Sequence, residues 1–384
     1  MEPLANYNRL KALNLKLDMS RGKPSPEQLD LSLPLLAISD YKDDTGVDAR
    51  NYSNLEGIPE ARRFFAELQG VAVNECLVGG NSSLELMYHT VELLRNTYGK
   101  GKWLCPVPGY DRHFRVTEVL GYELISVPMT AEGPDMDEVE RLARDPEVRG
   151  IWCVPKYSNP DGYTYSGEVC KRLANMSAAP GFTVIWDNAY GWHHIAAKGD
   201  ELPNFTALCK AAGNPDRAVA FCSTSKITFG GAGVAAVSSS EANINALVKY
   251  FTAMTIGFDK LNQLRHVRFL KNEGGLAAHM EKHRAILAPK FQKVLDVFAA
   301  NLPPEVAEWT KPNGGYFISL YLNAGKAAKT VQLCKEAGVI LTPAGAAYPY
   351  GKDPEDRHIR VAPTYPSSDD LQTAAELLCV AASL

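Results

Sequence analysis

The sequence predicts an α/β fold in which a large domain has a mostly parallel mixed sheet between helices and a smaller α+β domain follows. Between about residues 51 and 241, short apolar runs alternate with helical patterns, which is typical of βα units and a largely parallel sheet. After Pro303-Pro304 this alternation gives way to another arrangement of strand-like runs. A chain of 384 residues is also long enough for roughly two domains of ordinary size.

The first segment, 1–41, is predicted to be an irregular arm that contributes to the small domain. Its stretch Arg21-Gly22-Lys23-Pro24-Ser25-Pro26 is rich in residues that favour turns. The large domain is expected to span 42–275. Its strands are predicted at 76–78, 103–105, 123–127, 151–154, 183–186, 218–222 and 233–237.

A long helical pattern over about 258–300 has an apolar stripe at Leu261, Leu264, Val267 and Leu270. We expect the domain boundary inside this pattern, at Gly274-Gly275. The small domain, 276–384, is predicted to contain strands near 315–320, 339–341 and 358–361, and a closing helix near 368–382.

Composition and charge exclude several classes of function. Apolar residues make up 46% and charged residues 22%, as in a soluble globular protein. The net charge of −4 offers no basic surface for nucleic acid or an anionic membrane. No apolar stretch reaches spanning length, and Met1-Glu2-Pro3 lacks a basic-then-apolar signal. A cytoplasmic location is therefore expected.

Cysteines and histidines give no metal site. The eight cysteines contain no pair spaced as a metal knuckle, so we expect reduced thiols. His279 and His283 have the i, i+4 spacing of metal ligands, but no third ligand is nearby, and we interpret them as a solvated helix face. His193 and His194 either line a site beside Tyr190 or, as we favour, are ordinary packing residues.

Two predicted strands each lead to an ionisable residue. The run Val184-Ile185-Trp186 ends in Asp187, and the run at 218–222 is followed by Ser223-Thr224-Ser225 and then Lys226. An open α/β sheet binds its ligands at the carboxyl ends of its strands. A lysine and a carboxylate at that edge suit pyridoxal 5′-phosphate, with the amine as imine partner and the acid facing the pyridinium nitrogen.

Asp187 needs a partner because burying an unpaired carboxylate is costly. A protonated pyridine nitrogen would serve. Taken alone, this residue is equally consistent with a structural ion pair or a metal ligand.

Two turns and one arginine have both an ordinary and a functional interpretation. Gly79-Gly80-Asn81-Ser82-Ser83 precedes a helical pattern and is either a plain N-cap or an anion site. Asn159-Pro160-Asp161-Gly162 is a strong turn signal, and Asn159 would in addition donate a hydrogen bond into a site. Arg360 lies in a strand-like run and is either a surface arginine or a bidentate partner for an α-carboxylate.

Taken together, these motifs resemble the fold-type I pyridoxal-phosphate-dependent aminotransferases (class I/II). That family has an Asn-Pro-x-Gly turn, an Asp-x-x-Tyr strand end, a Ser-x-Ser-Lys element and a late arginine, in this order. Here they are Asn159–Gly162, Asp187–Tyr190, Ser223–Lys226 and Arg360. The segment 312–317, Pro-Asn-Gly-Gly-Tyr-Phe, also looks like a strand of the family's small domain, so the resemblance covers most of the chain.

The resemblance implies roles for individual residues. Lys226 would be the Schiff-base lysine and proton shuttle, and Asp187 would pair with the ring nitrogen. Tyr190 and Asn159 would bind the 3-oxygen of the ring, and Tyr110 would stack on it. The cofactor phosphate would be held by Gly80, Asn81, Ser82 and Ser223.

The resemblance also implies a homodimer with shared active sites, because Tyr52 would reach the phosphate of the neighbouring subunit. One departure concerns the phosphate: many members have an arginine shortly after the lysine, and this chain has Val234 there. Neutral donors with the helix dipole, or another cation, would have to take its place.

The residues of these motifs look most like those of the divergent bacterial aspartate aminotransferase subgroup. This resemblance implies two substrates, an amino acid, expected to be aspartate, and a 2-oxo acid, expected to be 2-oxoglutarate. Arg360 would bind the α-carboxylate with Asn159 and Gly22 nearby. Arg21, Lys23 or Lys260 would bind the distal carboxylate.

Two alternatives stay open. A decarboxylase or a C–S lyase would use the same cofactor and fold. A non-catalytic regulatory protein on this fold would not need the Lys226, Asp187 and Asn159 set, and we see no room for the winged-helix domain of a regulator before the large-domain pattern begins.

Overall fold

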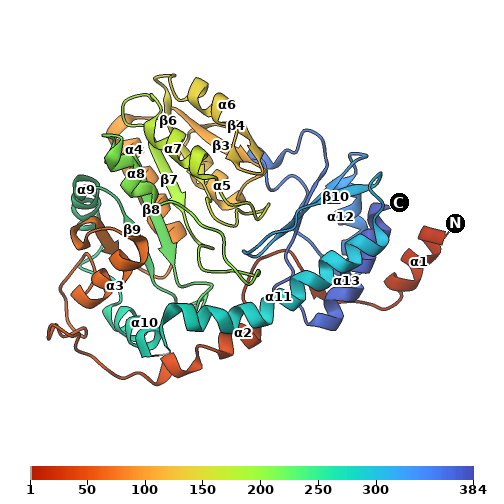
Figure 1. Ribbon diagram of the computed structural model, residues 1–384, viewed down its shortest axis with the longest axis horizontal. Helices are drawn as coiled ribbons and strands as arrows, with labels where there is room; N and C mark the ends of the chain where they lie inside the picture. Colours follow the sequence, from red (N-terminus) through yellow and green to blue (C-terminus); the bar gives the residue numbers. More distant parts are fainter. Residues whose placement is uncertain (1, 273) are drawn as a thin grey trace.

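The computed structural model describes residues 2–272 and 274–384 and shows a large α/β unit joined to a smaller α+β unit (Figure 1). The large unit contains an eight-stranded sheet in the order β2-β9-β8-β7-β6-β3-β4-β5. The pairs along β8-β7-β6-β3-β4 are parallel, and β2, β9 and β5 pair antiparallel. The mostly parallel mixed sheet expected from the sequence is confirmed.

The strands of this sheet lie close to their predicted positions, and the short hairpin strand β5 is an addition. Their bounds are β2 Cys76–Val78, β3 Lys102–Val107, β4 Glu123–Thr130, β5 Gly133–Pro134, β6 Val148–Cys153, β7 Thr183–Asp187, β8 Ala218–Ser223 and β9 Ala235–Ser238. The helices around it are α3 Pro59–Gln69, α4 Ser83–Tyr98, α5 Asp111–Val119, α6 Met136–Leu142, α7 Gly167–Asn175, α8 Phe205–Ala211, α9 Glu241–Phe251 and α10 Lys260–Asn272, with the 3-10 turn η2 Val73–Glu75.

Alternation along β7 divides its side chains between the two faces of the sheet. Ile185 packs in the apolar cluster that contains Phe114 of α5. Trp186 packs in the cluster on the other face, where its ring stacks on that of Phe205 of α8. Asp187, two residues after Ile185, therefore emerges on the α5 side of the sheet.

The smaller unit has the three-stranded antiparallel sheet β10-β11-β13. Its elements are α11 Gly275–Asn301, β10 Ala307–Trp309, β11 Ile318–Leu322, α12 Ala327–Glu336, β12 Val339–Ile340, η3 Pro349–Gly351, β13 His358–Val361 and α13 Ser368–Ala382. Figure 1 shows α11 running from the large unit along the smaller one towards α13.

The N-terminal arm is more regular than the sequence suggested. It contains α1 Glu2–Lys11, β1 Leu17–Asp18, α2 Pro26–Asp30 and η1 Leu33–Ala37. Tyr7 and Leu10 of α1 are buried in the core of the smaller unit, and β1 pairs parallel with β12. The turn-rich segment at 21–26 predicted an irregular arm. The contacts of α1 were not predictable, because its apolar side packs on a distant part of the chain.

The predicted long helix is two helices. α10 ends at Asn272, residue 273 lies outside the described part, and Gly274, with φ of 79°, precedes α11. Only glycine readily adopts this left-handed conformation. Along α11, Met280 packs with Leu35 and Ile227, whereas Phe291 lies in the small core. The domain division at 275 and 276 thus falls at the first residue of α11 and stays a prediction.

All eight cysteines are buried and none forms a disulfide. Among the described residues, no helix is both long and apolar enough to cross a membrane.

Candidate active site

The ends of two neighbouring strands place an amine and a carboxylate at one edge of the large sheet. Asp187 is the last residue of β7 and pairs in register with Phe221 of β8. After β8 the chain turns, with the Ile227 N–H donating to the Thr224 carbonyl at 2.9 Å. Lys226 lies in this turn, and its Nζ is 4.8 Å from the centroid of the Tyr190 ring.

The Asp187 carboxylate is held on one side only. Its Oδ2 lies 2.9 Å from Nε2 of His113, and both side chains are almost fully buried. The His113 ring is fixed in turn by stacking on Trp152, with centroids 4.4 Å apart. Oδ1 of Asp187 is buried without a hydrogen-bond partner among the described residues. A buried acceptor in this state is costly unless a donor from outside the described protein groups, a water or a ligand, reaches it.

The role of His113 beside Asp187 was not predicted from the sequence. It lies one helical turn after Tyr110 at the start of α5, and the two rings meet edge to face at 4.9 Å. The spacing of three residues from a predicted site tyrosine was the available signal. Its contact with Asp187, however, depends on how α5 packs on the sheet.

The two site tyrosines are neutral phenols at physiological pH. Burial raises the pKa of Tyr190, as does the Asp187 charge, and the Arg360 charge and the Asn159 side chain only partly oppose the rise. Burial raises the pKa of Tyr110 to about 12, although the nearby Lys226 charge acts in the other direction. Both hydroxyls can therefore donate a hydrogen bond.

Asn159 combines both interpretations of its turn. The Gly162 N–H donates to the Ser158 carbonyl at 2.7 Å, and Gly162 has a φ of 75° that favours glycine. Asn159 Oδ1 accepts a hydrogen bond from Nη1 of Arg360 at 3.1 Å. The Asn159 Nδ2 donor is buried and has no partner in the described part of the chain.

Arg360 is buried at the junction of the two units. Its Nη1 also donates to Oδ1 of Asp111 at 3.1 Å, and its Nε donates to Oγ1 of Thr342 at 3.3 Å. The guanidinium lies 4.8 Å from the centroid of the Phe317 ring. Asp111, which the sequence analysis did not single out, is thus the carboxylate that faces Arg360 in this structure.

Gly22 of the arm packs against Phe317, the ring beside the Arg360 guanidinium. A Cβ built on Gly22 would lie 2.6 Å from Cζ of Phe317, so the close approach requires glycine. Arg21 is exposed, and Lys23 Nζ lies 3.2 Å from Oδ2 of Asp18 and 3.8 Å from the Tyr365 ring centroid. Their predicted role towards a distal carboxylate stays a prediction.

The glycine turn after β2, residues 79–83, leads into α4, and we call it the cradle because it is the predicted phosphate site. Ser82 is the N-cap of α4, so the ordinary interpretation of this motif is confirmed. Asn81 links the turn to the lysine segment, because its carbonyl accepts from Oγ of Ser225 at 3.2 Å. Gly80 contacts β9, the neighbour of β2 in the sheet, because the Ala235 N–H donates to the Gly80 carbonyl at 2.8 Å. Ser223 ends β8 at the same edge.

Val234 brings no charge to this cradle. It is 1% exposed, and its N–H and carbonyl bond the Thr224 hydroxyl and N–H at 2.9 and 2.8 Å. Lys260, at the start of α10, is 6% exposed, and burial lowers the pKa of its amine. Two residues on, the Asn262 side chain donates to the Gly233 carbonyl at 2.9 Å.

Three of the four histidines to which the sequence analysis gave no functional role are buried, and His194 is half-buried. His279 and His283 are 0% and 1% exposed, so the solvated helix face expected for them is wrong. Their side of α11 faces the lysine segment rather than solvent, since His279 Nε2 lies 2.7 Å from the Ile227 carbonyl oxygen. His193 is equally buried, and its Nε2 lies 3.1 Å from the Lys226 carbonyl oxygen.

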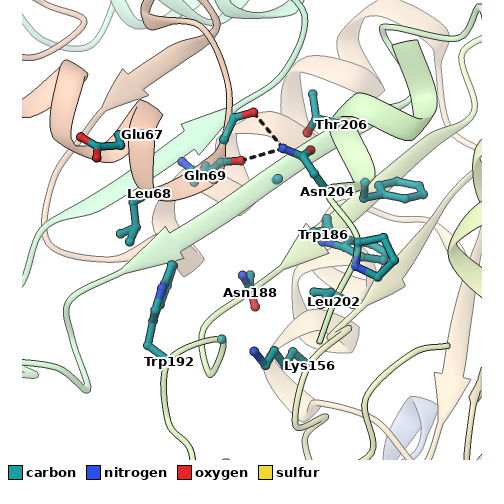
Figure 2. Close-up of a pocket in the computed structure, with 15 residues that line it drawn as sticks. Glu67, Leu68, Gln69, Lys156, Trp186, Asn188, Trp192, Leu202, Asn204 and Thr206 are labelled. Carbon is teal, nitrogen blue, oxygen red and sulfur yellow. Dashed lines mark hydrogen bonds between the residues drawn. The ribbon is translucent and has the colours of Figure 1, made fainter. Parts of the chain in front are cut away.

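A cavity of about 320 Å³ lies on the opposite face of the sheet (Figure 2). Its lining includes Trp186 and Asn188, the residues on either side of Asp187 in the chain, but neither Asp187 nor Lys226. Figure 2 shows Asn204 closing one side through its two hydrogen bonds to the Gln69 and Gly70 carbonyls. Strand alternation thus separates this cavity from the amine and carboxylate.

Solved structures show which class of protein has this arrangement. An aspartate transaminase of Corynebacterium glutamicum superposes with a TM-score of 0.95 at 44% identity, over 99% of this chain and 93% of that one. An α-aminoadipate aminotransferase of Thermus thermophilus, complexed with N-(5′-phosphopyridoxyl)-L-leucine, has a TM-score of 0.80 at 23% identity, covering 98% and 94%. The fold is that of the fold-type I pyridoxal-phosphate-dependent aminotransferases.

The family is shown by sequence as well. A family model described as aspartate amino-transferase matches residues 2–384. An aspartate aminotransferase of Corynebacterium glutamicum is 46% identical over 96% of this chain and 89% of its own. The chain belongs to the aspartate aminotransferase family and is an aminotransferase.

Proposed function

We propose that this aminotransferase uses pyridoxal 5′-phosphate and moves the amino group of aspartate to 2-oxoglutarate. The observation that supports the cofactor best is a pair of buried polar atoms with no hydrogen-bond partner among the described residues, the acceptor Asp187 Oδ1 and the donor Asn159 Nδ2. Both lie in the site that contains Lys226 and Tyr190. The cofactor's protonated ring nitrogen and 3-oxygen are the complementary groups.

The residues present fit this cofactor. Asp187 would face the ring nitrogen, and Asn159 with Tyr190 would bind the 3-oxygen. Tyr110 would cover one face of the ring. The phosphate would lie in the cradle of Gly80, Asn81, Ser82 and Ser223, where backbone N–H groups and the dipole of α4 favour an anion. When bound, pyridoxal phosphate supplies an electron sink that stabilises negative charge at the substrate Cα.

The chain's own groups then have separate tasks. Asp187, oriented by His113, keeps a negative charge where the ring nitrogen carries its proton. Lys226 Nζ would act as the base that takes the proton from the substrate Cα and would carry it as an ammonium. Arg360 positions the α-carboxylate with its planar pair of donors. Asp111 shares Nη1 of Arg360 with Asn159, so the substrate carboxylate would take over the contact that Asp111 makes in this structure.

The identity of the amino donor rests on the relative that is 46% identical and named aspartate aminotransferase. A distal carboxylate requires a second cation, for which Arg21, Lys23 and Lys260 are the candidates. Lys260 is the one of the three that is buried in this structure.

We also propose that the protein is a homodimer and that it is located in the cytoplasm. Tyr52, which would reach the neighbouring subunit's phosphate, is 79% exposed. Leu36 and Ile256 are also large apolar side chains, with 62% and 65% exposure. A second copy of the chain would cover such residues.

Borohydride labelling tests the cofactor and the lysine together. The purified protein should be yellow, and reduction should fix the cofactor on Lys226. Lys226→Ala should abolish turnover without loss of the folded state. A stable label on a different lysine would overturn the assignment.

A panel of amino acids with 2-oxoglutarate tests the substrates. Aspartate and glutamate should be the best donors, and carbon dioxide or thiol release should be absent. Preference for aromatic or aliphatic donors would contradict the dicarboxylate assignment, and release of carbon dioxide or a thiol would favour the decarboxylase or lyase alternative.

A further inference from the structure

Two consecutive backbone carbonyls, those of Lys226 and Ile227, are bound by side chains from distant parts of the chain. The Lys226 carbonyl oxygen lies 3.1 Å from Nε2 of His193 and accepts a hydrogen bond from the Tyr316 hydroxyl at 3.4 Å. The Ile227 carbonyl oxygen lies 2.7 Å from Nε2 of His279. The catalytic tasks proposed above use none of these three side chains.

The network continues into the N-terminal arm through Gln28. The Ser25 N–H donates to Oε1 of Gln28 at 3.1 Å, which fixes the orientation of the amide. Nε2 of Gln28 is then the donor, to the Tyr316 hydroxyl at 3.0 Å and towards Nδ1 of His283, also at 3.0 Å. Gln28 is 0% exposed. Side chains from the arm, from α11 and from the segment just before β11 therefore form one hydrogen-bonded network at the backbone of Lys226 and Ile227.

The direction of the hydrogen bond at His193 follows from the contacts of its two ring nitrogens, with a ring that burial keeps neutral. Burial lowers the pKa of His193 to about 3, and burial together with the His279 charge lowers the pKa of His283 to about 4. Each ring therefore has one N–H near neutral pH. Nδ1 of His193 has no partner in the described part of the chain, whereas its Nε2 faces a carbonyl, so the proton belongs on Nε2.

We propose that His193 and Tyr316 are positioning residues for Lys226: their two donors hold its backbone carbonyl, and Gln28 ties this anchorage to the arm and to α11. This rests on the assignment of Lys226 as the reacting lysine. An amine that has to reach both the substrate Cα and the cofactor carbon depends on where its backbone is held, and a misplacement of about 1 Å costs on the order of 100-fold in rate.

The test uses variants that keep the aromatic packing and remove the donor. The His193 ring packs on Tyr316 with centroids 5.2 Å apart, so His193→Phe and Tyr316→Phe preserve that contact. We expect kcat to fall about tenfold in each, with the KM of the amino donor within about threefold, because Arg360 is untouched. His193→Gln, whose amide can donate, should recover most of kcat.

Two readouts separate positioning from a merely structural role. One is the pH titration of the visible absorption of the cofactor-loaded enzyme, which should shift by about half a unit or more in His193→Phe. The other is the rate at which the apoprotein turns yellow with added pyridoxal phosphate, which should fall several-fold. His89→Phe is the matched control, because His89 also packs among aromatic rings but on α4 and away from Lys226.

A lower melting temperature in His193→Phe and Tyr316→Phe with unchanged titration, kcat and loading rate would overturn the positioning role. Loss of labelling at Lys226 in the unmodified protein would instead refute the proposed function itself. The two failures are therefore distinguishable.

Discussion

Two buried aspartates at the large unit's edge differ in how their carboxylates are satisfied. Asp187 and Asp161 are 3% and 2% exposed. Asp161 accepts a hydrogen bond at 2.6 Å on Oδ1 from the Tyr321 hydroxyl of β11. Asp187 has His113 on Oδ2 and no described partner on Oδ1. The two carboxylates are equally buried, but Asp161 contacts Tyr321 of the smaller unit and Asp187 has one oxygen without a described partner.

The difference supports our proposal that a ligand binds the open oxygen of Asp187, because burial alone does not distinguish the two aspartates. Burial raises the pKa of Asp161 to about 6, although its hydrogen bonds act to lower it. This carboxyl joins the turn at 159–162 to the smaller unit. Asp187 ends β7 at the edge where β8 leads to Lys226, and a cationic donor from a ligand would bind its open oxygen.

The largest effect is expected at Asp187. Asp187→Ala should reduce kcat/KM at least about 100-fold, which corresponds to roughly 3 kcal/mol of lost transition-state stabilisation. Asp161→Asn should stay within a few-fold of the unmodified enzyme in the same steady-state assay. Similar losses in both variants would erase the distinction between the two aspartates.

Arg360→Lys should have the next largest effect. Its guanidinium donates to both Asp111 and Asn159, and a lysine ammonium cannot reproduce the planar pair of donors. We expect kcat/KM to fall about 10- to 100-fold for every amino donor. A loss confined to acidic donors would place Arg360 at the distal carboxylate instead.

His113→Phe should reduce kcat by about tenfold, because the ring can still stack on Trp152 while Asp187 loses its described partner. Cofactor affinity, measured by equilibrium dialysis, should weaken alongside. The variant Val119→Ala is a control on the same helix, because the Val119 side chain is exposed. Unchanged kcat and affinity in His113→Phe would mean that Asp187 is oriented by the backbone alone.

The smallest effect concerns stability. Because the folded-state pKa of Asp161 is raised to about 6 from 3.8, the folded state binds more protons between these values. The free energy of unfolding should fall as pH rises through this window. Asp161→Asn should remove this loss, on the order of 2 kcal/mol, above pH 6. Urea titrations at pH 4 and 7 measure it, and equal stability differences at both would contradict the raised pKa.

The predictable part of the site consists of residues at strand ends. Asp187 and Lys226 were identified because an apolar run announces a buried strand, and parallel strands bring their carboxyl ends to one edge. The N-cap at Ser82 and the turn at Gly162 were identified because hydroxyls and glycine have local conformational preferences.

The contacts that complete the site were not predictable in the same way. His113 reaches Asp187 from α5, Asp111 reaches Arg360 across the two units, and Gln28 reaches Tyr316 from the arm. His279 and His283 were misjudged because helical periodicity shows that they share a face but not what that face contacts.

The sequence by itself determined the α/β class, the order of the strands along the chain, and the strand-end lysine and carboxylate, since these follow from local periodicity and residue chemistry. Only the tertiary structure decided that Asp187 has one held and one open oxygen, that α1 joins the small core, and that the Lys226 carbonyl is bound by His193 and Tyr316. The reason is physical: burial and hydrogen-bond partners depend on which distant elements pack together, which no local pattern specifies.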